Sequence, residues 1–271
     1  MSVATALSIA GSDPSGGAGI QADLKAFSAR GVYGMAALTA LTAQNTTGVS
    51  GVHLVPPGFV AQQIAAIFED IRVDAIKIGM IASAEIAEAV ADAIAGFAGP
   101  VVLDPVMVAK GGHPLLPEDA VGSLRSRLLP RATLLTPNLP EAAALLGCDV
   151  ADTRAEMERQ VKALLGLGPE AVLLKGGHLG GGASPDLLAS GNETIWLEGP
   201  RVPTANTHGT GCTLSSALAA ELAKRRELPE AAVTVKAWLT GAIAGADDLD
   251  VGHGHGPTHH FHALWPLAGD L

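Results

Sequence analysis

The chain has 271 residues, of which 48% are hydrophobic and 3% aromatic, and its formal net charge is −10. That length allows one large α/β domain whose core consists mainly of aliphatic side chains. An acidic chain without a cluster of Lys and Arg is not expected to bind nucleic acid or an anionic membrane surface. A phosphate-bearing ligand would therefore need a local cationic or backbone N–H site.

The cysteine content and the first residues indicate a cellular compartment. The two cysteines, Cys148 and Cys212, do not make a disulfide framework in a chain of this length, so we expect a reducing compartment, the cytoplasm. The first ten residues have no basic segment followed by a long apolar run, so no signal peptide is indicated. No stretch reaches the roughly 20 apolar residues of a membrane span.

Short apolar runs alternate along the chain with stretches of helical periodicity. The runs predict strands at Ala6–Ala10, Met35–Ala43, Val49–Val55, Ala75–Ile78, Val101–Asp104, Thr133–Thr136, Ala171–Lys175 and Glu193–Leu197. The periodic stretches predict helices near Gly19–Arg30, Phe59–Asp70, Ser83–Phe97, Pro117–Leu128, Leu139–Leu146, Thr153–Leu167, Cys212–Arg226 and Pro229–Gly245. Thr153 and Glu156 predict a capping box. The alternation predicts an α/β fold with a mostly parallel sheet, and without a polar linker we expect residues 1–271 to form one domain.

A glycine-rich loop, Gly11–Gly19, directly follows the first predicted strand. Ligands of an open α/β sheet bind beyond the carboxyl ends of its strands, where this loop is expected. Residues Gly17–Ala22 match the loose dinucleotide fingerprint, but the acidic residue that the fingerprint needs about 20 positions later is missing. We therefore expect a flexible binding turn, with Asp23 one helical turn into the next helix; a plain tight turn is the alternative.

The second polar motif, Gln44–Gly48, lies at the end of an apolar strand. A carboxamide in this place can present a donor and an acceptor together to the edge of a heteroaromatic ring. A capped turn explains the same residues, and on this motif alone it is the stronger interpretation.

Oxygen-bearing side chains follow two further predicted strands. Asp104 ends the strand Val101–Asp104, and Asn138 and Glu141 lie three residues apart at the start of a helix. Carboxylate and amide oxygens suit Mg²⁺ or its bound waters. The alternatives are that Asp104 only terminates a strand before Pro105 and that Asn138 and Glu141 only cap a helix.

The segment Asn206–Thr213 is the most informative motif. Gly209 and Gly211 expose backbone N–H groups at a helix N-terminus, where a phosphoryl group in transfer would be stabilised. Cys212 lies where the helix dipole lowers the pKa of a thiol, so it could accept a proton; the alternative is a small buried residue. Lys175, at the end of another strand, could neutralise nucleotide phosphate or be an exposed strand-end lysine. No Gly-x-x-x-x-Gly-Lys-Ser/Thr sequence occurs, which excludes a P-loop enzyme.

The C-terminal tail is rich in histidine, with His253, His255, His259, His260 and His262. Such a tail can bind a metal ion. The run continues directly into Leu264–Pro266, which argues against a metal site there.

Taken together, these motifs resemble the bacterial hydroxymethylpyrimidine/phosphomethylpyrimidine kinases. The resemblance runs in order from about Leu7 to Trp265, and it is specific in combination although no motif is specific alone. The segments that carry it are Ala10–Lys25, Thr136–Ala142, Leu174–His178, Asn206–Thr213 and His259–His262.

The resemblance implies a ribokinase-like fold, which is a three-layer α/β/α sandwich with a mostly parallel central sheet. It implies ATP- and Mg²⁺-dependent transfer to 4-amino-5-hydroxymethyl-2-methylpyrimidine and then to its monophosphate, in thiamine diphosphate biosynthesis. The residues it implies for the pyrimidine are Gly11, Ala18, Asp23, Gln44, Met80 and Met107. Those for ATP are Asn138, Lys175, Thr210, Gly211 and Lys236. Those for catalysis are Lys175, Gly209, Thr210, Gly211 and Cys212, and those for the metal are Asp104 and Glu141.

Two positions bear on the alternatives. Sugar kinases of the wider superfamily carry an Asp base where this chain has Cys212, which agrees with the pyrimidine kinases. Relatives that also phosphorylate pyridoxal often carry a Cys beside the lid lysine, where this chain has Ala109 beside Lys110. A pyridoxal or pyridoxamine kinase of the same fold and a pyrimidine-binding protein without catalysis are the alternatives, and the complete set of candidate catalytic residues argues against the second.

The sequence leaves the oligomeric state open, with a homodimer as one outcome.

Overall fold

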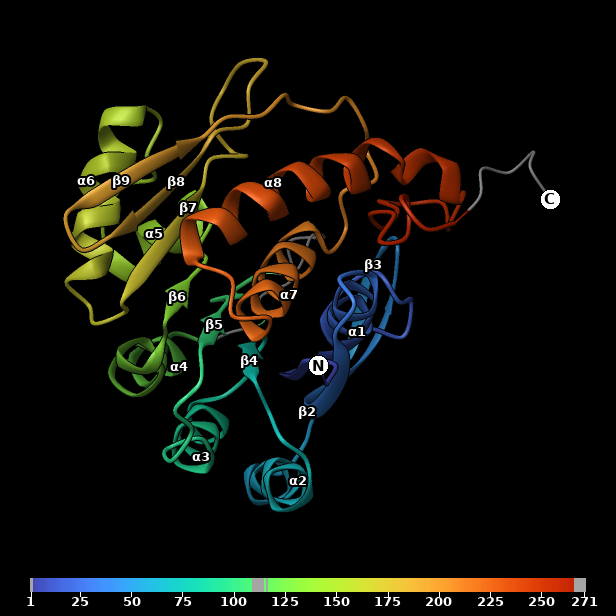
Figure 1. Ribbon diagram of the computed structural model, residues 1–271, viewed down its shortest axis with the longest axis vertical. Coiled ribbons are helices and arrows are strands. Elements are labelled where there is room, and N and C mark those ends of the chain that lie inside the picture. The colour runs from blue at the N-terminus through green and yellow to red at the C-terminus, as the bar shows by residue number, and fades with distance from the viewer. Residues whose placement is uncertain (1, 109–114, 116, 266–271) are drawn as a thin grey trace.

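The computed structural model describes residues 2–108, 115 and 117–265 (Figure 1). The strands are β1 (Thr5–Ser12), β2 (Tyr33–Asn45), β3 (Gly48–Leu54), β4 (Ala75–Ile78), β5 (Val101–Leu103), β6 (Leu134–Leu135), β7 (Ala171–Lys175), β8 (Asp186–Ser190) and β9 (Glu193–Leu197). The α-helices are α1 (Gly19–Ala29), α2 (Pro57–Asp70), α3 (Ala84–Ala93), α4 (Glu118–Ser123), α5 (Leu139–Leu146), α6 (Arg154–Leu165), α7 (Thr210–Ala223) and α8 (Leu228–Ala244). Ala109 and Lys110 lie outside the described residues.

In this part of the chain the strands form one nine-stranded sheet in the order β3-β2-β1-β4-β5-β6-β7-β8-β9. Neighbours from β2 to β7 are parallel, as where Leu7 lies between Met35 and Ile76. β3, β8 and β9 pair antiparallel and lie toward the two edges. The predicted mostly parallel sheet is confirmed. The sequence pattern does not predict β8, because its five residues follow a glycine-rich stretch that indicates a loop.

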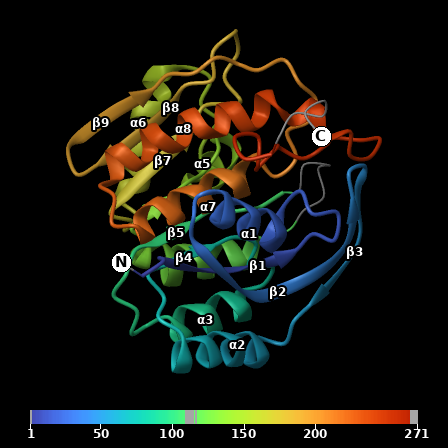
Figure 2. The same cartoon turned by 45° about the vertical axis from the view of Figure 1, so that its right-hand side comes forward.

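Helices cover both faces of this sheet (Figure 2). Leu7 and Ile9 of β1 belong to a core cluster that includes Ile64 of α2 and Val90 of α3. The alternate residue Ala6 belongs to a second cluster, with Leu218 of α7 and Leu239 of α8. Because successive side chains of a strand point to opposite faces, one strand feeds both cores. The predicted three-layer α/β/α sandwich is confirmed, with α1, α7 and α8 on one side and α2 to α6 on the other.

Two helix starts show how local sequence fixes the chain entering the site. The Asn138 side chain accepts a hydrogen bond from the backbone N–H of Glu141, and the Glu141 carboxylate accepts one from the backbone N–H of Asn138, which completes a capping box at α5. At α6 the predicted capping box is only half formed. Thr153 accepts from the backbone of Glu156, but the Glu156 carboxylate accepts instead from the backbone of Asp152.

No helix in the described ranges is long and apolar enough to cross a membrane.

Candidate active site

A cavity of about 670 Å³ opens where β1, β4, β5, β6 and β7 end. It lies at the edge of the sheet where ligands of open α/β folds bind. The candidate site residues that line it are Gly11, Ala18, Gln44, Met80, Asp104, Met107, Asn138, Glu141, Lys175, Gly209, Thr210, Gly211 and Cys212. The sheet therefore brings together residues up to two hundred positions apart in the sequence.

The loop Gly11–Gly19 and the entry to α7 lie backbone against backbone. Gly209 has φ +74°, and a Cβ there would overlap the carbonyl oxygen of Gly17. A Cβ at Gly17 would in turn overlap the His208 ring. Both glycines are thus required by close packing between the two loops, in addition to the left-handed backbone of Gly209. This contact holds the start of α7 against the cavity.

Helix α7 begins at the cavity without a side-chain cap. Its N-cap is Gly209, which makes no side-chain cap, and of the first N–H groups that of Thr210 donates to the carbonyl oxygen of Thr207 at 3.3 Å. Uncapped N–H groups and the positive end of the helix dipole make an anion site. A Cβ at Gly211 would lie 3.3 Å from Lys175 Nζ, so a cationic side chain stands beside the same N-terminus. The arrangement can hold a phosphoryl group.

Lys175 links two carboxylates at the floor of the cavity. Its Nζ lies 2.9 Å from Asp104 Oδ1 and 3.8 Å from Glu141 Oε2. Burial lowers the pKa of Lys175, but the carboxylates of Asp104 and Glu141 outweigh that effect and hold its pKa above the ordinary value. Lys175 is therefore a permanent cation at the predicted phosphate site and not an exposed strand-end lysine.

Glu141 has a different balance of charges. Burial raises its pKa to about 7, and Asp104 adds to this rise while Lys175 opposes it. Within the described ranges no three His, Cys, Asp or Glu side chains converge as a metal site made of protein ligands alone would require. Two hard carboxylates that share one cation nevertheless suit Mg²⁺ bound largely through waters and phosphate oxygens. The residues present fit that ion.

Cys212 differs from the expectation drawn from its helix position. Burial raises the pKa of its thiol to about 11, with Asp23 and Asp104 adding to the rise and Lys77 opposing it. The predicted lowering of the pKa by the helix dipole is wrong for the free protein, because desolvation outweighs the dipole. The thiol lines the cavity in its protonated form at neutral pH.

Asp23, which we expect to bind the pyrimidine, is not among the residues that line the cavity. Its carboxylate is fully buried and accepts hydrogen bonds from Lys77, Ser8 and Ser216. Lys77 itself was not predicted as a site residue, although it does line the cavity. The available signal was a lysine inside the apolar strand Ala75–Ile78, since such a side chain must find a buried anion. Asp23 thus contacts one residue of the cavity lining, Lys77.

Lys236, which we expect to bind ATP, is likewise not among the residues that line the cavity. Its Nζ donates to Asp186 Oδ2 at 2.7 Å and to the carbonyl oxygen of Ser184 at 2.6 Å. Asp186 also accepts from the backbone N–H of Gly176 at 3.0 Å. The ammonium is committed to the loop between β7 and β8, so it supports the segment that carries Lys175.

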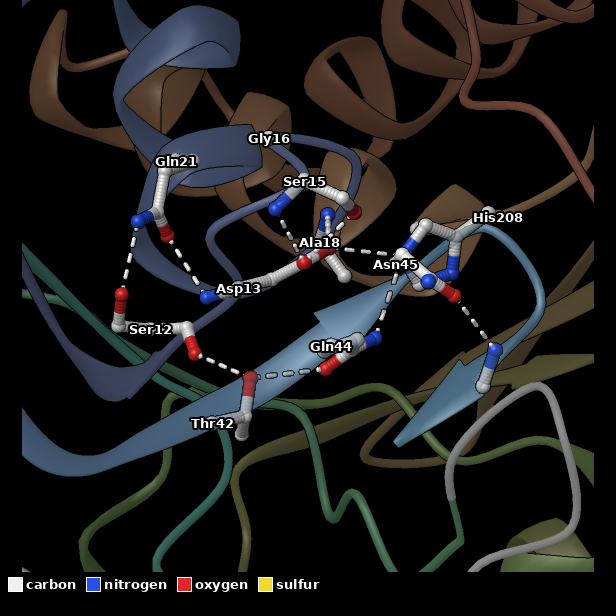
Figure 3. A network of polar contacts seen from close by, with 12 residues as sticks. Ser12, Asp13, Ser15, Gly16, Ala18, Gln21, Thr42, Gln44, Asn45 and His208 are labelled. Carbon is white, nitrogen blue, oxygen red and sulfur yellow. Dashed lines mark hydrogen bonds and ion pairs between the residues drawn. The ribbon is translucent and has the colours of Figure 1, made fainter. Parts of the chain in front are cut away.

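A polar network that sequence reasoning did not single out forms another wall of the cavity (Figure 3). Asp13 Oδ2 lies 2.8 Å from His208 Nε2, and both side chains are almost fully buried. His208 Nε2 lies 3.4 Å from Gln44 Nε2, and Gln44 Oε1 lies 3.1 Å from Thr42 Oγ1. Burial favours the protonated form of Asp13, but hydrogen bonds from His208 and Ser15 outweigh it and lower its pKa. Asp13 and His208 were visible only as polar members of the two glycine motifs.

The histidine tail packs against the fold. His260 is buried with its Nε2 2.9 Å from Thr213 Oγ1 in the first turn of α7. The ring of His262 stacks obliquely on Trp238, and that of His259 meets Trp265 edge to face. These contacts give His259, His260 and His262 a packing role.

An uncapped helix N-terminus, a buried lysine between two carboxylates and an apolar wall with one carboxamide suit the transfer of a phosphoryl group to a small organic acceptor. The sequence model of a family described as phosphomethylpyrimidine kinase matches residues 13–259, and the chain belongs to that family. A hydroxymethylpyrimidine/phosphomethylpyrimidine kinase of Salmonella typhimurium is 56% identical over 261 residues, which are 96% of this chain and 98% of the relative.

Solved structures agree with the fold. The ADP complex of Bacillus subtilis pyridoxal kinase has a TM-score of 0.90 and 40% sequence identity. The match covers 98% of this chain and 100% of that chain. Phosphomethylpyrimidine kinase from Clostridium difficile 630 has a TM-score of 0.78 and 43% identity, and that match covers 89% of this chain and 99% of that chain. The Bacillus subtilis structure is thus an ADP complex of an enzyme with a closely similar fold.

Proposed function

We propose that this enzyme transfers the γ-phosphoryl group of ATP to the hydroxyl of 4-amino-5-hydroxymethyl-2-methylpyrimidine, and a second one to the resulting monophosphate, for thiamine diphosphate synthesis. The observation that carries the proposal is one cavity that joins a ring-sized apolar wall to an anion site. The Salmonella typhimurium relative, whose printed name covers both reactions, supports it.

The ring would lie between Ala18 and the methionines Met80 and Met107, which supply apolar contact without charge. Gln44 would pair with an edge of the ring through its carboxamide. The hydroxymethyl group would then point toward the start of α7. Holding the two reactants in this geometry supplies much of the acceleration expected of a kinase.

At the phosphoryl site, the N–H groups of Gly211 and Cys212 would receive the equatorial oxygens, and Lys175 would balance their charge. Phosphoryl transfer depends mainly on such positioning and charge stabilisation. Mg²⁺, when bound, supplies neutralisation of the phosphate charge, and Asp104 and Glu141 are the residues that would hold it or its waters. Asn138 would line the nucleotide side.

We assign to Cys212 the removal of the hydroxyl proton. Its pKa of about 11 means that a small thiolate fraction performs this step at neutral pH. A base of this kind adds a limited factor, about 10²–10⁴. The bulk of the rate would then rest on the anion site.

A pyridoxal kinase activity is the second candidate, because the Bacillus subtilis structure bears that name. Ala109 beside Lys110 argues against efficient use of pyridoxal. We further propose that residues 1–271 form a single kinase domain that works in the cytoplasm. A homodimer stays a hypothesis, for which sedimentation of the purified chain is the test.

Turnover of ATP by the purified chain separates these functions. We expect ADP release to rise when the hydroxymethylpyrimidine is added and to stay near background with pyridoxal. Faster turnover with pyridoxal would favour the second candidate. No stimulation by either ring, with the pyrimidine still bound in a calorimetric titration, would indicate a binding protein without catalysis.

A further inference from the structure

The hydrogen bonds around Asp13 determine where the proton of His208 lies. Asp13 Oδ1 accepts from the backbone N–H and the hydroxyl of Ser15, at 2.9 and 2.7 Å. Asp13 Oδ2 accepts from the backbone N–H of Ala18 at 2.8 Å and faces His208 Nε2 at 2.8 Å. A carboxylate that accepts from so many donors is ionised, which agrees with its lowered pKa. His208 Nε2 therefore carries a hydrogen and donates it to Asp13.

Because His208 Nε2 carries this hydrogen, it cannot accept a hydrogen bond from the amide nitrogen of Gln44. A ring nitrogen that donates has no lone pair free, yet Gln44 Nε2 lies 3.4 Å from it. On the other side, the single hydroxyl hydrogen of Thr42 is directed to the carbonyl oxygen of Ser12 at 2.8 Å. Gln44 Oε1, 3.1 Å from that hydroxyl, thus faces an oxygen whose lone pair is free but whose hydrogen is taken.

A half turn of the Gln44 carboxamide pairs both of its ends. The amide NH₂ then donates to Thr42 Oγ1. The carbonyl oxygen accepts a bifurcated hydrogen bond from His208 Nε2, whose hydrogen is also directed to Asp13. The oxygen and nitrogen of a carboxamide occupy nearly the same volume, so the hydrogen-bond network decides between the two orientations. After these pairings one N–H and one lone pair remain for a ligand in the cavity.

We propose that Asp13 and His208 are positioning residues that fix the order of donor and acceptor on Gln44, and that this order makes the site select a 4-amino over a 4-oxo pyrimidine. The inference rests on the proposed function, because it concerns the same substrate pocket. A 4-amino ring presents an amino donor beside a ring-nitrogen acceptor, and a 4-oxo ring presents a carbonyl acceptor beside a ring N–H donor.

The ring cannot turn over to compensate for the wrong order. Its hydroxymethyl group must point to the start of α7, which fixes which edge meets Gln44. Buried polar groups left without partners make such sites discriminate strongly. Removing the His208 donor frees the carboxamide to adopt either orientation, so it also frees Gln44 to accept the 4-oxo ring.

The test compares two ligands, 4-amino-5-hydroxymethyl-2-methylpyrimidine and its 4-oxo analogue, by calorimetric binding without ATP and by kcat/KM with ATP. The wild type is expected to prefer the amino compound by about 100-fold in both. His208→Leu should reduce that preference at least tenfold, chiefly through tighter binding of the oxo compound. His208→Gln, which keeps an N–H near the position of Nε2, should retain most of the preference.

Gln21→Leu is the matched control. The Gln21 carboxamide holds the same loop through the backbone N–H of Asp13 and the hydroxyl of Ser12, at 2.9 and 2.8 Å, whereas Gln44 contacts Thr42 and His208. This variant should weaken both ligands by a similar factor and leave the preference unchanged. An unchanged preference in His208→Leu, or an equal loss of preference in Gln21→Leu, would overturn the inference and leave the proposed function intact. Absence of binding and turnover of the amino compound by the wild type would overturn both.

Discussion

Lys77 Nζ donates to both carboxylate oxygens of Asp23 at 2.9 Å, and neither side chain has any exposed surface. Burial lowers the pKa of Lys77, but the carboxylate of Asp23 outweighs this effect, Asp104 adds to it, and the pKa is raised. The pair joins β4 to α1, and Lys77 belongs to the cavity lining. This ion pair places two opposite charges where the wall of the cavity meets the core.

Removal of one partner of this pair should destabilise the fold. Lys77→Met leaves the Asp23 carboxylate buried without a counter-ion, at an expected cost of about 3–5 kcal/mol in the free energy of unfolding. Urea unfolding followed by circular dichroism measures the loss. The double variant Lys77→Met with Asp23→Asn removes both charges and should recover at least half of it. A single variant as stable as the wild type would show that the pair does not act as a charged unit.

Replacement of Cys212 should change both the rate and its pH dependence. With a thiol pKa of about 11, the thiolate fraction rises about tenfold per pH unit through the neutral range, so the kcat of the wild type should rise from pH 7 to 9 where phosphoryl transfer limits turnover. Cys212→Ser should lower kcat at least tenfold and remove this rise, with little change in ATP affinity. Steady-state kinetics across that range tests both effects. An unchanged rate and profile would make Cys212 a packing residue.

Truncation of Gln44 should weaken the pyrimidine selectively. Gln44→Ala removes the paired hydrogen bonds to the ring edge, at an expected cost of about 1–3 kcal/mol in pyrimidine binding. ATP affinity should stay within a factor of about two, because the side chain of Gln44 contacts Thr42 and His208, which are not among the residues assigned to ATP. Calorimetric titration of both ligands checks this. Equal losses for the two ligands would contradict the assignment.

His260 should make the fold sensitive to mild acid. Burial lowers its pKa from 6.5 to about 3, with Lys25 and His259 adding to the effect. Between these two values the unfolded chain binds a proton that the folded chain does not, so stability falls as the pH falls through that window. At pH 5 the loss is about 2 kcal/mol relative to pH 8.

The matched variants for this effect are His260→Gln and His253→Gln. His260→Gln keeps a donor for Thr213 and should flatten the part of the stability curve between pH 7 and 5. His253 is exposed, so its replacement should leave the curve as in the wild type. Urea midpoints at several pH values give the curves, and parallel curves for His260→Gln and the wild type would contradict the prediction.

The order of strands and helices could be predicted because each buried parallel strand is a short apolar run and each helix has an amphipathic period. The cavity residues at strand ends, such as Asp104 and Lys175, could be predicted because the strands themselves could be located in the sequence. β8 was missed because five residues after a glycine-rich loop carry too little pattern.

The pairings and proton affinities were not accessible from the sequence. Asp23 meets Lys77 across 54 positions, and Asp13 meets His208 across 195, so neither pair leaves a local spacing. The raised pKa of Cys212 depends on desolvation, which a position at a helix start does not reveal. Both the pairing of these side chains and their pKa values depend on contacts between residues that lie far apart in the sequence.

The product formed from 4-amino-5-hydroxymethyl-2-methylpyrimidine, ATP and Mg²⁺ tests the proposed kinase activity most directly. Anion-exchange chromatography of timed samples should show the monophosphate first and then the diphosphate, with two ATP consumed for each diphosphate. Lys175→Met, which removes the cation beside the start of α7, should slow both steps. Formation of neither product by the wild-type chain would contradict the central claim.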